Sequence, residues 1–269
     1  MSIKTERLLS RAKKLAKNGE DKKAKEIYSN ILKAFPDNQT AKKEFKLLTN
    51  EKGVNPSQLQ LNEVMKLYET GNIKQALDYV ESLIKDYPNE SLLFNICGAC
   101  HSETGSIELA IENFKKAIAL KIDYSEAQFN LGVAFQKLNQ LDNAKEYYLQ
   151  AIHSQHAYPS AHNNLGIIFL NKGRIDAAVK SFEWAIAYSP NYAEAYNTLG
   201  SALQELKQFK NAKKQFEKAC SINPNYAQAF HNLGILSEIT NQPKEAVSQY
   251  ERAVEIEPEF AEAYRNLSK

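Results

Sequence analysis

Residues 193–224 read AEAYNTLGSALQELKQFKNAKKQFEKACSINP. Apolar residues recur in it at steps of three and four positions, in two segments that residues 207–209 separate. Such spacing is typical of helices that bury one face. Pro224 ends the second segment, because proline has no backbone N–H to donate and cannot continue a helix. The stretch therefore predicts two helices joined by a short turn.

The same pattern occurs six times without a break between residues 57 and 260, with a period of 34 residues. Each repeat has an alanine at one position, namely Ala76, Ala110, Ala144, Ala178, Ala212 and Ala246. A large apolar residue follows four positions later, namely Val80, Phe114, Tyr148, Phe182, Phe216 and Tyr250. Twelve positions before the alanine the repeats have Val64, Gly98, Gly132, Gly166, Gly200 and Gly234. Because alanine and glycine are small, we expect the two helices of a repeat to cross closely beside them.

This pattern resembles the tetratricopeptide repeat family over most of the chain. The matching positions of one repeat are Tyr196, Leu199, Gly200, Leu203, Ala212, Phe216, Ala219 and Pro224. The resemblance implies an all-α fold, a right-handed superhelical solenoid of antiparallel helix pairs, with the first helix of each repeat lining a concave face. One such pair cannot bury its apolar face alone, so neighbouring repeats are expected to stack.

The repeats also divide the chain. Residues 1–48 are predicted to form a degenerate, basic repeat of this kind plus one further helix. Residues 49–56 are the predicted linker or kink, because the 34-residue register breaks there and the segment contains glycine and proline. Six repeats are predicted over residues 57–260, and residues 261–269 are expected to form a partial repeat that acts as a capping helix.

Composition and charge indicate a soluble protein. The chain has 269 residues, 25% of them charged, and a formal net charge of +2 at pH 7. No apolar run approaches the roughly 18 residues that a membrane span needs, and the charged start of the chain does not look like a secretory signal. Three cysteines are too few for a disulfide framework, and their odd number fits a reducing compartment. We therefore expect a cytoplasmic protein that does not enter a membrane.

One short motif has a spacing associated with a cofactor. Residues 97–101 read C-G-A-C-H, and C-x-x-C-H is the pattern that attaches c-type haem. However, Cys97 occupies the position of Leu131 in the next repeat, and His101 occupies that of Phe135. We therefore expect both side chains in the core, where cysteine behaves as a small apolar residue.

Other chemical sites find less support in the sequence. His153, His156 and His162 are near one another in the chain, but His156 replaces a closing proline and His162 replaces an aromatic residue. No nucleophile with a base and no glycine-rich phosphate loop can be recognised. The sequence therefore predicts no metal, no cofactor and no catalytic residue, so we do not expect an enzyme.

Asparagine recurs on the predicted first helices. A carboxamide offers both a donor and an acceptor, which matches the N–H and C=O of a peptide backbone. Packed helices lie about 8–10 Å apart and an extended chain advances about 3.3 Å per residue, so successive asparagines can hold a peptide at intervals of a few residues. The candidate peptide-binding residues are Asn62, Asn95, Asn130, Asn163, Asn164, Asn197, Asn232, Asn266 and His231.

This row resembles the asparagine ladder in the tetratricopeptide superhelix of O-linked N-acetylglucosamine transferase, and the superhelix as a whole resembles that of bacterial proteins similar to this transferase. The resemblance implies that the row holds a substrate protein. The alternative interpretation is that these asparagines only bond to a neighbouring helix.

The sequence thus predicts a non-catalytic protein–protein interaction module that binds an extended peptide of a partner in its concave groove. One alternative is the substrate-recruiting N-terminal arm of a larger enzyme, such as a glycosyltransferase, sulfotransferase, methyltransferase or oxygenase, because the last repeat stops midway. A second alternative is nucleic-acid binding through the basic N-terminus, where residues 1–52 hold 14 Lys and Arg against 7 Asp and Glu. Solvated lysines on helix faces explain that charge more simply. The ends of a solenoid would also allow a homo-oligomer.

Overall fold

The computed structural model describes residues 3–17, 20–48 and 55–268, and these form sixteen α-helices and no strand. The all-α prediction is therefore confirmed. The helices are α1 (Ile3–Lys17), α2 (Asp21–Ala34), α3 (Gln39–Leu48), α4 (Gln58–Glu69), α5 (Ile73–Asp86), α6 (Ser91–Glu103), α7 (Ile107–Leu120), α8 (Ser125–Lys137), α9 (Leu141–Ser154), α10 (Pro159–Asn171), α11 (Ile175–Tyr188), α12 (Ala193–Glu205), α13 (Phe209–Ile222), α14 (Ala227–Ile239), α15 (Pro243–Ile256) and α16 (Ala261–Leu267). None of these described helices is long and apolar enough to cross a lipid bilayer.

The two helices of a repeat approach each other where a glycine meets an aromatic ring. A Cβ atom at Gly200 on α12 would lie 2.6 Å from Cε1 of Phe216 on α13, closer than two carbon atoms can pack. The same contact pairs Gly98, Gly132, Gly166 and Gly234 with the ring sixteen residues later. The sequence predicted a close crossing of the helices beside these glycines. The structure shows that the aromatic ring leaves no room for a side chain at the glycine position.

The first of the six repeats reaches the same packing with different residues. Val64 stands at the glycine position and Val80 at the aromatic position, and both are fully buried in one cluster. Val80 on α5 is smaller than the aromatic residue of the other repeats, and Val64 on α4, which is larger than glycine, fills the space that this leaves. The exchange keeps the interior closely packed.

Every turn inside a repeat needs one residue with a left-handed backbone. Positive φ angles recur every 34 residues, at Gly71, Gly105, Asn139, Gly173, Lys207 and Asn241. At the end of α12, the N–H of Gln208 donates to the carbonyl of Leu203 (2.9 Å) and the N–H of Lys207 donates to that of Gln204 (2.8 Å). This pair of hydrogen bonds is the Schellman arrangement, which favours glycine at the left-handed position. Lys207 therefore has a strained backbone where three other repeats have glycine.

We predict that Lys207→Gly stabilises the protein. The left-handed conformation costs a residue with a Cβ about 1–2 kcal/mol, and the greater freedom of glycine in the unfolded chain offsets part of that gain. The free energy of unfolding measured by chemical denaturation should rise by roughly 0.5–1 kcal/mol. Lys214→Gly, on the exposed middle of α13, is the matched control and should lower it by about 1 kcal/mol. Equal destabilisation by both variants would contradict this explanation of the turn.

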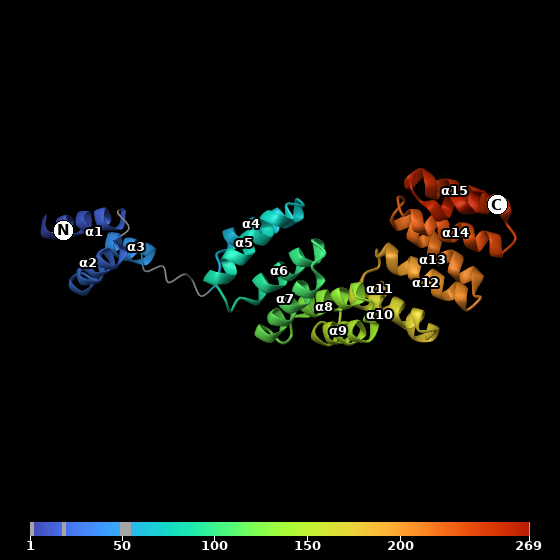
Figure 1. Cartoon of the computed structure of the whole chain (residues 1–269), viewed down its shortest axis with the longest axis horizontal. Coiled ribbons are helices and arrows are strands. Elements are labelled where there is room, and N and C mark those ends of the chain that lie inside the picture. Colours follow the sequence, from blue (N-terminus) through green and yellow to red (C-terminus); the bar gives the residue numbers. More distant parts are fainter. Residues whose placement is uncertain (1–2, 18–19, 49–54, 269) are drawn as a thin grey trace.

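Successive repeats share one interior. A single cluster of buried residues contains Phe114 of α7, Leu131 of α8, Tyr148 of α9 and Ile168 of α10, so it extends across three repeats. Figure 1 shows the helix pairs following one another from α4 to α15, with the two termini at opposite ends of the molecule. The repeats are therefore stacked, as a helix pair with one apolar face requires.

The first helices lie on the inner side of this stack. Helices two apart in the chain also contact each other, and the strongest of these contacts beyond α3 join first helices: α6 with α8, α10 with α12, and α12 with α14. In a curved stack, the helices on the inside of the curve lie closer together than those on the outside, so the first helices lie on the inside. We call the exposed surface of the first helices the inner face.

The ends of the chain follow the predicted pattern in part. Helices α1–α3 pack around a separate cluster in which Ala12, Ala24 and Tyr28 are completely buried. Residues 49–54, most of the predicted linker, lie outside the described residues, so the division of the chain at 49–56 stays a prediction. At the other end, Ala263 of α16 is buried beside Ala253 of α15. A capping role for residues 261–269 also stays a prediction, and Lys269 is not described.

Candidate functional site

One position of the repeat carries a buried polar residue in four of the first helices. Asn95 on α6, Asn163 on α10, Asn197 on α12 and His231 on α14 stand at the same position of their repeats and are at most 6% exposed. Phe129 takes this position on α8. A buried carboxamide or imidazole has to find hydrogen-bond partners inside the protein, because it has lost those in water.

Each of these four residues bonds to the residue 35 positions later, on the next first helix. Asn130 Nδ2 donates to Asn95 Oδ1 (3.1 Å), Thr198 Oγ1 to Asn163 Oδ1 (2.8 Å), Asn232 Nδ2 to Asn197 Oδ1 (2.9 Å) and Asn266 Nδ2 to His231 Nε2 (3.1 Å). We call these four bonds the inter-repeat ladder. They join successive repeats through their first helices.

Two members of the ladder also hold a carboxylate. Asn95 Nδ2 donates to Glu126 Oε1 at 2.9 Å, and Asn163 Nδ2 donates to Glu194 Oε1 at 3.1 Å. Glu126 and Glu194 are exposed at the start of α8 and α12. The buried asparagines thus fix the position of two negative charges beside the inner face, and the sequence analysis did not identify these glutamates.

The other candidate residues remain within reach of solvent. Asn130, Asn164, Asn232 and Asn266 are partly exposed, and Asn62 on α4 is exposed, where it accepts a hydrogen bond from Gln58 at 2.8 Å. Asn164 Nδ2 donates to the hydroxyl of Tyr148 at 3.2 Å. The nine predicted residues therefore separate into two groups, four that are buried between repeats and five that solvent reaches.

Aliphatic side chains accompany the partly exposed asparagines. Val133, Ile167 and Ile235 are half-buried and follow Asn130, Asn164 and Asn232 by three positions. Residues three apart lie on the same side of a helix. The inner face therefore offers carboxamides and apolar surface side by side on α8, α10 and α14.

The haem-like motif lies inside the stack. Cys97 and Cys100 are buried free thiols on α6, in a cluster with Val64 and Val80, and His101 is 9% exposed. The core position expected for Cys97 and His101 is confirmed. Burial, with a contribution from the charge of Glu81, raises the pKa of the Cys97 thiol to about 12.

The other histidines do not form a three-ligand group within the described ranges. Nε2 of His162 lies 3.2 Å from the carbonyl oxygen of His156, and His153 is exposed on α9. Burial lowers the pKa of His162, with smaller and opposing contributions from that carbonyl and from the ring of His156.

The histidine of the ladder makes this part of the stack sensitive to pH. Burial lowers the pKa of His231, and the charges of Glu262 and Glu238 offset only part of that effect. The rings of Tyr250 and Phe260 pack against the imidazole. Nε2 accepts from Asn266 only while the imidazole is neutral, because both nitrogens of a protonated ring are donors.

We predict that His231→Asn makes the protein less sensitive to acid. The folded protein binds a proton at His231 less readily than the unfolded chain, so this residue lowers the free energy of unfolding as the pH falls through about 6.5. Asparagine occupies the same position on α12, so the variant should fold. Chemical denaturation between about pH 7.5 and 5.5 should show a smaller loss of stability in the variant.

The control for this prediction is His153→Asn, since His153 is exposed. Its loss of stability over the same pH range should equal that of the wild type. A pH dependence that is unchanged in His231→Asn would show that the ladder histidine does not titrate as the structure implies.

Known families match the centre of the chain. Tetratricopeptide repeat models match residues 129–182, 193–226 and 216–248, and a TPR repeat model matches residues 102–139 and 166–207. Together these matches run without a gap from residue 102 to residue 248, which is more than half of the chain.

Single proteins with a similar sequence or structure share less than 30% of their residues with this chain. The peroxisomal targeting signal receptor of Saccharomyces cerevisiae is 28% identical over 92 residues, which are 34% of this chain and 15% of the receptor. The match thus spans a small part of the receptor's length. The APC/C hetero-tetramer Cut9–Hcn1 is 18% identical with a TM-score of 0.69, covering 97% of this chain and 55% of that one. YrrB, described as a TPR protein with an unusual peptide-binding site, is 18% identical with a TM-score of 0.55. The match covers 71% of this chain and 98% of the YrrB chain. Identities this low in the two solved structures establish a common fold alone.

Proposed function

Since this chain belongs to the tetratricopeptide repeat family, we propose that its inner face binds an extended segment of a partner protein and carries out no catalysis. YrrB and the yeast receptor support a role of this kind, because the description of each refers to recognition of a peptide or a targeting signal. The family relationship by itself does not say which residues bind. The arrangement of the asparagines carries that part of the proposal.

The observation that carries the proposal is the row of partly exposed carboxamides on the inner face. The amide of Asn130 donates to Asn95, and its Oδ1 atom has no partner among the described residues. Asn164 and Asn232 provide further carboxamides on α10 and α14. An extended chain has one N–H and one C=O per residue to pair with such groups. Hydrogen bonds to the backbone would tolerate many partner sequences.

The buried asparagines have a different proposed role. The amide groups of Asn95, Asn163 and Asn197 bond to the next repeat, so they hold the face in shape and do not touch the ligand. His231 belongs with them. The proposed contacts to the peptide are therefore the five residues that solvent reaches: Asn62, Asn130, Asn164, Asn232 and Asn266. We propose that only these five residues act like the asparagine ladder of the transferase.

Charge adds a preference among partner segments. Glu126 and Glu194 lie two repeats apart at the edge of the inner face, and each is held by a buried asparagine. Oriented carboxylates attract lysine and arginine, and the attraction between exposed charges weakens as salt is added. We therefore propose a segment with basic residues, bound less tightly at high ionic strength. A cytoplasmic location and association through the ends of the stack stay predictions.

We predict that Asn130→Ala combined with Asn164→Ala weakens peptide binding. The probe is an array of synthetic peptides, from which the tightest binder of the wild-type protein is taken for calorimetric titration. Loss of two hydrogen bonds at about 0.5–1.5 kcal/mol each should raise the dissociation constant about 5- to 150-fold. Asn113→Ala combined with Asn143→Ala removes two asparagines of the second helices, the partly exposed one on α7 and the exposed one on α9, and should leave the dissociation constant unchanged.

A further variant separates binding from folding, because Asn130 also belongs to the inter-repeat ladder. Ile167→Ser copies Ser201, which stands at the same position of the next repeat, and leaves all ladder bonds intact. It should weaken binding. Because Ile167 packs against the cluster around Phe182, the thermal unfolding midpoint should fall modestly, while circular dichroism should show that the variant is still folded at the temperature of the titration. Unchanged affinity in both the double-alanine variant and Ile167→Ser would refute the proposed face.

A further inference from the structure

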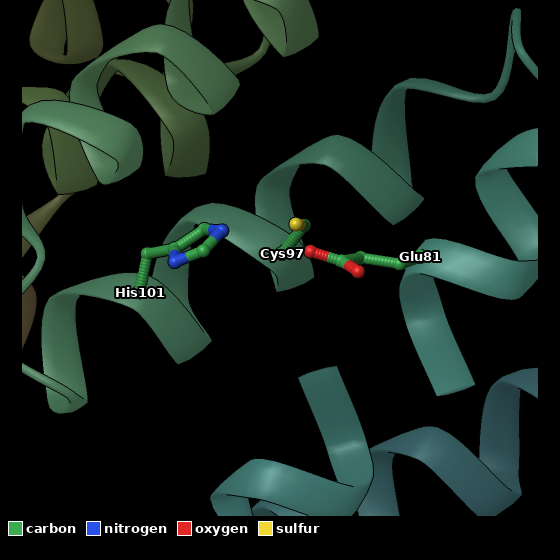
Figure 2. Close-up of side chains that lie close together, drawn as sticks. All are labelled: Glu81, Cys97 and His101. Carbon is green, nitrogen blue, oxygen red and sulfur yellow. The ribbon is translucent and has the colours of Figure 1, made fainter. Parts of the chain in front are cut away.

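Three side chains with metal-binding atoms meet between the first and second of the six repeats. A carboxylate oxygen of Glu81 on α5, Sγ of Cys97 and a ring nitrogen of His101, both on α6, all lie within 4.8 Å of one another. Figure 2 shows the Glu81 carboxylate reaching from its helix toward Cys97. Cys97 and His101 are four positions apart, which places them on the same side of α6.

The other repeats show that the fold does not require these residues. Where α6 has Cys97, the next four first helices have leucine: Leu131, Leu165, Leu199 and Leu233. Where α6 has His101, the next two have Phe135 and Phe169. Both positions are in the core, and a polar ring there costs stability unless it finds a partner. Among the described repeats, only this one has a thiol and an imidazole at these two positions.

We propose that Glu81, Cys97 and His101 bind a divalent transition-metal ion, with zinc as the preferred one. The inference rests on this cluster alone and does not depend on the peptide-binding proposal. Thiolate, imidazole and carboxylate are the three kinds of side chain that zinc takes in proteins. Imidazole and thiolate together disfavour magnesium and calcium, which prefer oxygen ligands.

The geometry is close to what a tetrahedral ion needs. Zinc bonds of roughly 2.0–2.3 Å place ligand atoms about 3.3–3.7 Å apart, so from separations within 4.8 Å the three side chains need to close by at most about 1.5 Å. Glu81 is exposed, and its carboxylate can make this movement by changing its rotamer. Water takes the fourth position, on the solvent side of Glu81. Cys100 is not a ligand, which separates this site from haem attachment.

A bound ion would join two repeats. Glu81 belongs to the second helix of one repeat and Cys97 with His101 to the first helix of the next, so the ion would connect α5 to α6. Binding to the folded but not the unfolded chain stabilises the folded state. The proposed role is therefore structural, at the point where the regular stack begins.

The test is titration of the reduced full-length chain with cobalt(II), followed by displacement with zinc. A site with one thiolate and one imidazole should take up one cobalt per chain, with a thiolate-to-cobalt charge-transfer band in the near ultraviolet and the intense visible bands of tetrahedral cobalt. Zinc should abolish both signals at one equivalent. It should also raise the thermal unfolding midpoint.

The variants for this test copy residues of the neighbouring repeats, so they should fold. Cys97→Leu combined with His101→Phe reproduces Leu131 and Phe135, and should abolish both cobalt bands and the stabilisation by zinc. Loss of a residue that only hydrogen-bonds to a metal ligand typically weakens metal binding roughly 10–100-fold. Glu81→Gln removes a ligand itself, so it should weaken cobalt binding by at least that factor. Cys100→Ala copies Ala134 and is the matched control, which should bind cobalt as the wild type does.

Three results would overturn the proposal. The first is no stoichiometric binding to the reduced wild-type chain. The second is binding without a thiolate charge-transfer band, which would place the ion on other residues such as the histidines near α9. The third is equal binding by the wild type and by Cys97→Leu with His101→Phe, provided that circular dichroism shows both folded.

Discussion

In five of the six repeats, a glycine of the first helix lies directly against an aromatic ring of the second, and the stacking of the repeats follows from this close contact. It sets how near the two helices of a repeat come, at Gly98 with Phe114 and at the four equivalent pairs. Where the glycine is replaced by Val64, the ring is replaced by Val80, so the space between the helices stays filled. Because each repeat has the same shape, the repeats stack in a regular way and the same residue positions meet at every junction.

That regularity explains why hydrogen bonds recur between first helices. Asn163 meets its partner 35 positions later on the next first helix, and the same offset joins the other three pairs of the ladder. The junction then divides the polar side chains by burial. Those at the buried position receive the inter-repeat bonds, and two of them also donate to Glu126 and Glu194. Those one position later donate the inter-repeat bonds and stay partly exposed.

The sequence predicted the helix pairs well, because a period of 34 residues fixes both the helical faces and the turns. The break predicted at residues 207–209 is displaced by one residue from the observed one, because α12 ends at Glu205 and α13 begins at Phe209. The roles of neighbouring asparagines could not be predicted, since Asn163 and Asn164 look alike in sequence and only the position of the next helix decides which is buried. Glu81 escaped attention for the same reason, because its approach to Cys97 depends on how two repeats stack.

Site-specific photo-crosslinking can show directly whether partners bind along the first helices, as we propose. A photoreactive phenylalanine in place of Val133 or Ile167 on the inner face should cross-link to a bound peptide. The same residue in place of Glu112 on α7 or Asn143 on α9 should not. Cross-links formed from the second helices and absent from the first would contradict the proposal.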